Sequence, residues 1–307
     1  MSTDQSPYAE IDVTQWPSAG DEQLGTKPKR WLMHPDTGES WLLKYATYST
    51  GSDGSCYRKG DDWAEFIASR VAAGLGTPAA HVELAVERSE TVRYGIISKS
   101  VLTEDEQSGD SDGELVLGNG LLARPTAPGD RLGYTIDAVQ AALANTKPPI
   151  GSPPGFGAWD VFAGYLVLDC LIGNTDRHEE NWAVIVTPNE RRLAPSFDHA
   201  SSLGFQISDA QRNQRLETRD EGFTPETYAR RAKSPFANKP HLIDVASAAL
   251  DRCTRAVREH WLSACEDVDE LVRPIWRVPD DRMSEVARQF AERLLRSNCA
   301  RLFDQVR

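Results

Sequence analysis

Residues 171–205 carry polar groups of the kinds that phosphoryl transfer requires. Within Gly-Asn-Thr-Asp-Arg-His-Glu-Glu-Asn-Trp, the acid Asp176 precedes the amide Asn181 by five positions, and a second acid, Asp198, follows another apolar run. Phosphoryl transfer needs a carboxylate to orient the attacking hydroxyl, an amide and a second carboxylate for magnesium, and a cation on the phosphates. This stretch supplies all of them except the cation.

The apolar runs around these groups predict a hairpin that brings two of them together. Strands are expected over residues 182–186, directly after Asn181, and over residues 193–197, directly before Asp198. Asn181 and Asp198 would then stand at the two bases of the hairpin and converge on one magnesium ion. A surface hairpin with acid-rich turns is the competing interpretation, and for the spacing of Asp176 and Asn181 alone it is the better one.

His178 lies two positions after Asp176 and has three interpretations. It could be a metal ligand, a proton carrier or a buried strut that hydrogen-bonds the loop. We favour the strut, and we group His178 with Asp176 as the candidate catalytic pair.

The missing cation is predicted at Lys44. This lysine interrupts the apolar run from Trp41 to Ala46, where a charge is costly to desolvate unless an anion meets it. It is therefore a candidate for binding nucleotide phosphates, with an edge-strand lysine in water as the alternative. Glu65 lies off the apolar stripe of a predicted helix, so it is either an ordinary solvated acid or the partner of Lys44.

Hydrophobic periodicity predicts the elements that must position these residues. A hairpin is expected over 25–46 with an Asp36-Thr37-Gly38 turn, and strand 92–97 should lead into a hinge at 98–102. The buried helix 159–172 should deliver the chain to the candidate site. The other expected elements are a strand over 8–16, a helix from Asp61 to about Gly74, a strand over 82–86, and helices over 136–144, 241–265 and 283–303.

Composition bounds the class of protein. A chain of 307 residues with 40% hydrophobic content can bury a large core, and we expect two lobes. The net charge of −12 argues against nucleic acid or an anionic membrane as the main partner. Five scattered cysteines without a C-x-x-C pair indicate neither a disulfide framework nor a zinc site. Without a signal peptide or a membrane-length apolar run, we expect a cytoplasmic protein.

Two sequence motifs taken together favour a phosphoryl-transfer site over a surface hairpin. Gly-Asn-Thr-Asp-Arg-His-Glu-Glu-Asn-Trp, followed by Ser-Phe-Asp-His-Ala-Ser-Ser, resembles the catalytic and metal-binding segments of HipA-like bacterial Ser/Thr kinases, known as toxins of toxin-antitoxin pairs. The D-R-H-x-x-N element is also similar to the catalytic loop of phosphatidylinositol kinases. The correspondence reaches from about Gly25 to Gly204.

The resemblance implies an α+β, two-lobed protein-kinase-like fold with a β-rich N-lobe and a mainly helical C-lobe. It further implies ATP and Mg²⁺ as cofactors, a Ser/Thr hydroxyl of a protein as acceptor, and an antitoxin or regulatory protein as partner. In this correspondence Asp176 is the catalytic base, and Asn181 and Asp198 are the magnesium ligands. The implied nucleotide-binding residues are Gly25, Thr26 and Lys29 of a phosphate loop, the pair Lys44 and Glu65, and Ile97 and Ser98 at the hinge.

Two departures limit the correspondence. Residues 20–24 lack the Ser-x-Ser element that some family members phosphorylate in themselves, and the separate N-terminal subdomain of the full toxins is not expected. The rival functions are a lipid or small-molecule kinase and a catalytically silent nucleotide-binding partner module. The expected organisation is a polar N-terminal segment (1–24), an N-lobe (25–101), a loop, helix and connector (102–157), and a C-lobe (158–307).

Overall fold

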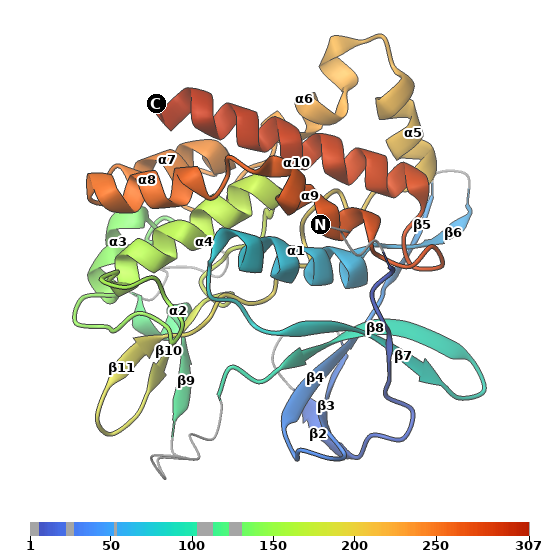
Figure 1. Cartoon of the computed structure of the whole chain (residues 1–307), viewed down its shortest axis with the longest axis horizontal. Helices are drawn as coiled ribbons and strands as arrows, with labels where there is room; N and C mark the ends of the chain where they lie inside the picture. Colours follow the sequence, from blue (N-terminus) through green and yellow to red (C-terminus); the bar gives the residue numbers. More distant parts are fainter. Residues whose placement is uncertain (1–5, 23–27, 52–53, 103–112, 123–130, 307) are drawn as a thin grey trace.

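The computed structural model describes residues 6–22, 28–51, 54–102, 113–122 and 131–306. It confirms the expected two-lobed α+β fold (Figure 1), in which a sheet-rich N-terminal part adjoins a mostly helical C-terminal part. Within these described ranges, no helix is long and apolar enough to span a membrane.

A six-stranded sheet forms the N-lobe. Its strand order is β1-β7-β8-β4-β3-β2, and every pairing is antiparallel except that of β1 with β7. Helix α1 (Asp61–Leu75) lies between this sheet and the helical lobe (Figure 1). The strands are β1 (Ile11–Asp12), β2 (Ser18–Glu22), β3 (Lys29–Met33), β4 (Ser40–Tyr45), β7 (Val82–Arg88) and β8 (Val92–Lys99).

Strand register decides which residues share the sheet face that α1 covers. Lys29 pairs with Lys44, and Lys44 pairs with Ile96. Ile96 belongs to the buried cluster that contains the apolar side of α1. Since side chains alternate along a strand, Leu43 and Ile97 point to the opposite face, where they pack in a separate core. The two lysines therefore lie on the face turned toward the helical lobe.

The C-lobe is built around two helices. Helix α4 (Ala158–Ile172) is buried on nearly all sides, and α10 (Glu285–Val306) packs across it. The same buried cluster continues from these helices into α1, so both lobes share one core. Around them stand α3 (Ile136–Ala142), α5 (Asp209–Glu217), the short helices η1 (Glu221–Phe223) and α6 (Pro225–Arg230), α7 (Leu242–Leu250), α8 (Arg255–Ser263) and α9 (Val268–Trp276).

Two smaller sheets complete the fold. Strand β10 (Ala183–Val186) pairs with β11 (Arg191–Leu193) on one side and with β9 (Glu114–Leu117) on the other. The second small sheet is the hairpin of β5 (Tyr48–Thr50) and β6 (Cys56–Arg58), which precedes α1. The short helix α2 (Gly118–Leu121) follows β9.

Four predicted boundaries are wrong. The strand expected over 8–16 is confined to β1, and the strand expected over 193–197 lies earlier, as β11. The single helix expected over 241–265 is two helices, because the Thr254 side chain accepts the Val257 N–H and starts α8 anew. Residues 98–99, expected in a hinge, are the last residues of β8.

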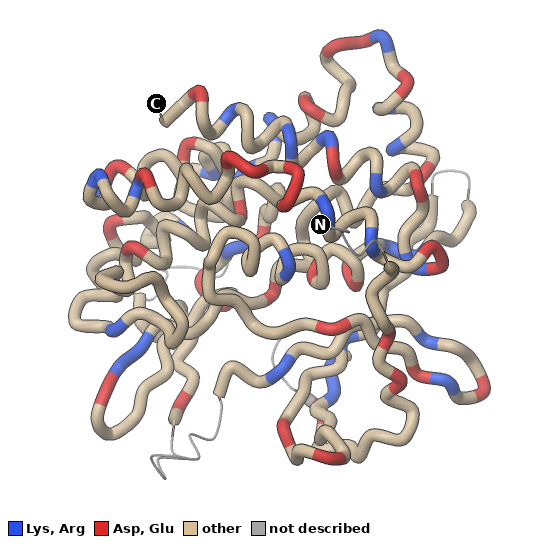
Figure 2. The backbone as a smooth tube through the Cα atoms, viewed as in Figure 1, with Lys and Arg blue, Asp and Glu red and all other residues tan. Residues whose placement is uncertain are grey.

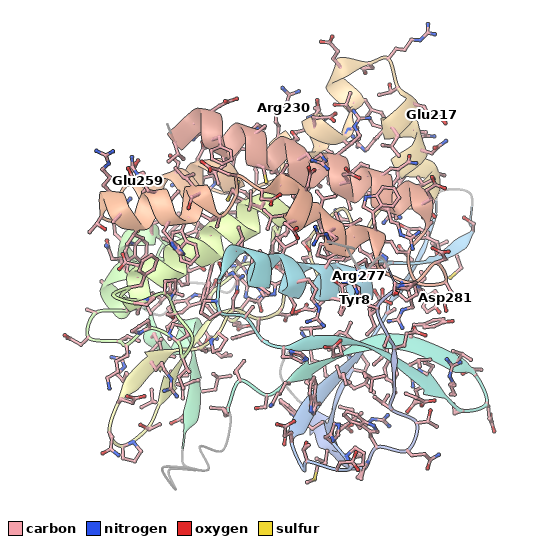
Figure 3. The ribbon with its side chains drawn as sticks, in the orientation of Figure 1. Tyr8, Glu217, Arg230, Glu259, Arg277 and Asp281 are labelled. Atoms are coloured by element: carbon pink, nitrogen blue, oxygen red, sulfur yellow. The ribbon has the colours of Figure 1, made fainter. Side chains whose placement is uncertain are left out.

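A buried arginine ties the helical lobe to the sheet. Arg282, in the segment before α10, is fully buried and pairs with Asp62 of α1 at 3.1 Å. It also pairs with Glu10 and donates to the carbonyls of Ala85 and Gly95, on β7 and β8. Figure 3 shows Tyr8, Arg277 and Asp281 at this junction, and Figure 2 shows acidic and basic residues interspersed along the chain rather than segregated by lobe.

Removal of the Arg282 guanidinium should be strongly destabilising. Arg282→Met leaves the buried carboxylate of Asp62 without its cation, which costs about 3–5 kcal/mol in comparable buried pairs. The matched control is Arg255→Met, because Arg255 is 89% exposed and pairs with Glu259 one helical turn away. That change should leave the unfolding free energy nearly unchanged, because exposed ion pairs contribute little to stability. Urea unfolding of both variants measures the difference, and equal costs would contradict the prediction.

Candidate active site

The end of helix α4 positions the loop that carries the candidate base. The helix stops at Gly173, whose left-handed backbone (φ +69°) reverses the chain. Asn174 donates its side-chain N–H to Asp169 Oδ1 at 2.8 Å. Its own Oδ1 accepts the backbone N–H of Asp176 at 3.1 Å. The buried carboxylate of Asp169 therefore sets the start of the loop.

Arg177 fastens this loop to the rest of the site. Its Nε and Nη2 donate to the two carboxylate oxygens of Asp169 at 2.8 and 2.9 Å, in a pair that is almost fully buried. Burial alone would lower the pKa of the guanidinium, but the charge of Asp169 raises it overall. The remaining N–H groups donate to the carbonyls of Asn181 and Phe197 and to Ser196 Oγ. One side chain thus holds both ends of the predicted hairpin.

The candidate base lies at the surface of this scaffold, and the candidate amide ligand, Asn181, is buried beside it. The Asp176 side chain is 49% exposed, and its Oδ2 accepts a hydrogen bond from Ser201 Oγ at 3.4 Å. Asn181 donates its Nδ2 to the Asp176 carbonyl at 2.6 Å. Because the amide nitrogen is used in this way, the amide oxygen is the atom that could bind a cation.

The His178 ring hydrogen-bonds the backbone of its own loop, as expected for a structural strut. Its Nδ1 accepts the backbone N–H of Glu180 at 3.1 Å, while its Nε2 lies 3.8 Å from Asp176 Oδ1. The first contact closes the turn between the base and Asn181. The second leaves the ring beside the candidate base, so its catalytic role stays a prediction.

Asp198 stands at the meeting point of the two lobes. Its Oδ1 is 3.0 Å from Lys44 Nζ, and its Oδ2 is 3.9 Å from Lys29 Nζ. Burial would raise the pKa of this carboxyl group, but the two ammonium groups outweigh burial and hold its pKa well below the usual value. Asp198 is therefore ionised, and it draws both lysines of the sheet toward the C-lobe loop.

Glu65 reaches the same cluster from α1. Its carboxylate is fully buried, and burial alone would raise its pKa, but the charge of Lys44 and a hydrogen bond from His199 lower the pKa overall. Its Oε1 lies 3.7 Å from His199 Nδ1. Among the described residues, the direct ion pair of Lys44 is with Asp198, so Glu65 acts on Lys44 through space.

The other predicted nucleotide residues divide into three groups. Lys29 joins the cluster through Asp198. Ile97 and Ser98 lie on β8, but the Ile97 side chain is buried on the far face of the sheet, which leaves only its backbone for a ligand. Gly25 and Thr26 fall outside the described residues.

The donor set suits magnesium bound together with phosphate. Among the described residues, no group of three or more His, Cys, Asp or Glu side chains could hold a metal ion. Magnesium, however, commonly takes one or two protein carboxylates and completes its shell with water and substrate phosphates. The carboxylate of Asp198 and the amide oxygen of Asn181 fit that requirement, and the Asp198 side chain is 30% exposed.

Several residues that build the site were not singled out from the sequence. Asp169 had a signal, because it is an acid inside an otherwise apolar helix. Arg177 and His199 lie within the quoted strings, but Arg177 finds a partner across the hairpin and His199 faces Glu65 of α1. Ser201 also lies within the quoted strings, but its contact with Asp176 spans 25 positions of the chain, which no local pattern records.

Removal of Arg177 should unfold the site and destabilise the protein. Arg177→Met leaves Asp169 as an uncompensated buried charge, at a cost of about 3–5 kcal/mol. The double change Arg177→Met with Asp169→Leu should recover part of that loss. Arg192→Met is the control, since Arg192 pairs with Glu190 at the rim of a hairpin. Chemical denaturation measures all three, and additive losses in the double variant would contradict the prediction.

The ionised carboxylate of Asp198 should stabilise the folded state, and protonation in acid should remove that contribution. A carboxyl group with a lowered folded-state pKa stabilises the fold above its unfolded pKa, about 3.9, and loses that contribution as pH falls toward the folded pKa. The difference in unfolding free energy between wild type and Asp198→Asn should therefore be constant above about pH 5 and shrink below about pH 4. Denaturation series across this range measure it. A difference that grows in acid would show that the sign is wrong.

Comparison with known proteins identifies solved structures of similar fold. No protein-family model matches the sequence, and no curated protein matches it significantly. The proinflammatory kinase CtkA of Helicobacter pylori is similar over 97% of this chain and 97% of its own, with a TM-score of 0.68 and 19% sequence identity. HipA of Shewanella oneidensis MR-1, solved with HipB and operator DNA, is similar over 95% of this chain and 68% of its own, with a TM-score of 0.59 and 15% identity. The chain therefore has the fold of HipA-like kinases.

Proposed function

We propose that this protein is a kinase that transfers the γ-phosphoryl group of ATP to a Ser or Thr hydroxyl of a protein. The observation that carries the proposal is the convergence of Lys29, Lys44 and Asp198 beside the loop of Asp176 and Asn181. Two cations, a carboxylate and an amide oxygen for a metal, and an exposed carboxylate for the acceptor are the parts that phosphoryl transfer uses.

The sheet face beside the lysines supports a nucleotide as the ligand. Trp31, Leu42 and Ser98 pair in one row across β3, β4 and β8, two residues along from the row of lysines. Two residues of a strand span about 6.6 Å. A nucleotide with its phosphates at Lys29 and Lys44 would thus set its base over the Trp31 row.

The residues of the loop supply the chemistry at the acceptor. Asp176 would orient the acceptor hydroxyl and take its proton as the oxygen attacks the γ-phosphorus, while the bond to the β–γ bridging oxygen breaks and ADP leaves. Magnesium, when bound, neutralises charge on the phosphates. Asn181 and Asp198 would hold it, and Lys44, released from Asp198, would contact the phosphates.

A regulatory protein is the proposed partner. HipA was solved with HipB in a toxin-antitoxin complex with operator DNA. For this chain we propose an antitoxin-like protein in the same role. Its net charge of −12 argues that contact with DNA would have to pass through that partner. We keep the cytoplasm as the proposed location, since all five cysteines are free thiols.

Loss of the candidate base should abolish transfer without loss of the fold. Asp176→Asn removes the proton acceptor from a half-exposed position, so phosphorylation should fall by about 10²–10⁴-fold with little change in unfolding free energy. Glu180→Gln, an exposed acid of the same loop, is the matched control. Incubation with labelled ATP and magnesium in cell lysate, followed by identification of the labelled species, measures both.

Each alternative predicts a different result in this experiment. Full activity of Asp176→Asn would refute the assignment of the base. Label that enters inositol lipid rather than protein would favour a lipid kinase. Nucleotide binding by the purified wild type without any transfer would favour a silent nucleotide-binding module.

A further inference from the structure

A hollow opens beside the candidate catalytic loop. Its volume is about 490 Å³, and two segments far apart in the sequence form its walls. One wall is the approach to α3, and the other is the turn between α6 and α7. The lining residues are Arg131, Leu132, Pro235, Phe236, Ala237, Asn238 and Lys239.

Direct contacts connect this hollow to the catalytic loop. Arg131 Nε lies 3.4 Å from Glu179 Oε2, and Glu179 stands between the candidate base and Asn181 in the chain. Tyr134 donates its buried hydroxyl to the Arg177 carbonyl at 2.7 Å. The Tyr134 ring also stacks on Phe236 in the wall, with ring centroids 4.1 Å apart. A molecule in the hollow would therefore contact residues, such as Arg131, that themselves contact the candidate catalytic loop.

The turn that forms the second wall is held in one conformation. Asn238 and Lys239 both have left-handed backbones, with φ of +65° and +48°. Two successive non-glycine residues in this region cost free energy and persist only where contacts enforce them. Here Ala237 N–H donates to the Tyr134 carbonyl, and Lys239 N–H donates to the Phe236 carbonyl. The wall is thus preformed, which lowers the ordering cost of binding.

The lining combines exposed apolar surface with positive charge. Leu132 is 70% exposed and contributes apolar surface to the hollow. Arg131 is partly neutralised by Glu179, whereas Lys239 has no ion pair among the described residues. Because the whole chain has a net charge of −12, its long-range field would not attract an acidic ligand. Arg131 and Lys239 would therefore act on such a ligand at short range.

We propose that this hollow binds the acceptor polypeptide, and that it selects a segment with an acidic residue and an apolar residue near the Ser or Thr. Lys239 would pair with the acid, and Leu132 would pack against the apolar side chain. This inference rests on the proposed kinase function and names the substrate class of the same site. A polypeptide suits a hollow that has a preformed wall and mixed apolar and charged chemistry.

Peptide binding tests the proposal without requiring catalysis. The probes are two short fluorescent peptides of equal length, with one serine flanked by Leu and Glu in the first and by Leu and Lys in the second. Fluorescence anisotropy with the Asp176→Asn protein, loaded with ATP and magnesium, gives both affinities. The acidic peptide should bind at least about tenfold more tightly than the basic one.

Variants in the two walls locate the binding site. Lys239→Asn removes the charge but keeps a residue that tolerates the left-handed backbone, and it should reduce binding of the acidic peptide by about tenfold. Leu132→Asp should weaken binding of the same peptide, and because Leu132 is exposed, the change should leave the fold intact. Lys233→Asn is the matched control, since Lys233 is exposed on the same segment outside the hollow, and it should leave the affinity unchanged.

The outcomes separate this inference from the proposed function. Equal binding of the two peptides, or unchanged binding by both wall variants, would overturn the hollow as the acceptor site even if wild type phosphorylates protein in lysate. Selective binding that depends on Lys239 and Leu132 would support it even if no transfer is observed. The absence of transfer in lysate counts against the kinase function alone.

Discussion

The buried ion pair of Asp169 with Arg177 is the interaction on which the candidate site depends. Asp169 comes from the last turns of the most buried helix, and Arg177 uses every N–H of its guanidinium on the helix, the loop and the hairpin. Lysine could not replace it, because a point charge lacks the planar fork that reaches several acceptors at once. The polar chemistry of the loop therefore rests on a rigid apolar support, as an active site requires.

Ion pairs between the two lobes are a second constraint on the candidate site. Asp198 belongs to the C-lobe, and both lysines that approach it belong to the sheet. Glu65 adds a buried negative charge from α1, and its Oε2 has no hydrogen-bond partner. An excess of negative charge around Lys44 keeps that ammonium charged despite its burial. In the proposed reaction, Lys44 of this cluster would exchange its carboxylate partner for a phosphate.

Residue types and periodicity were enough to predict most of the fold and part of the site. The apolar run of α4 and the hairpin of β3 and β4 are strong local signals, and the lysine in β4 was informative because a charge there needs a partner. The partner itself was harder to predict, because Lys44 meets Asp198 across 154 positions, which no local pattern records. The break at Thr254 was missed because the apolar period continues through it, while a single side-chain cap decides the boundary.

The backbone of Asp198 restricts which amino acids can occupy that position at all. Its φ of +59° lies in the left-handed region, which glycine, asparagine and aspartate adopt more readily than other residues. Of these three, only aspartate carries a charge for the lysines. Glutamate would keep the charge but adopts this conformation less readily, whereas asparagine would keep the conformation but not the charge. Two independent preferences, one steric and one electrostatic, thus both favour aspartate at this position of the chain.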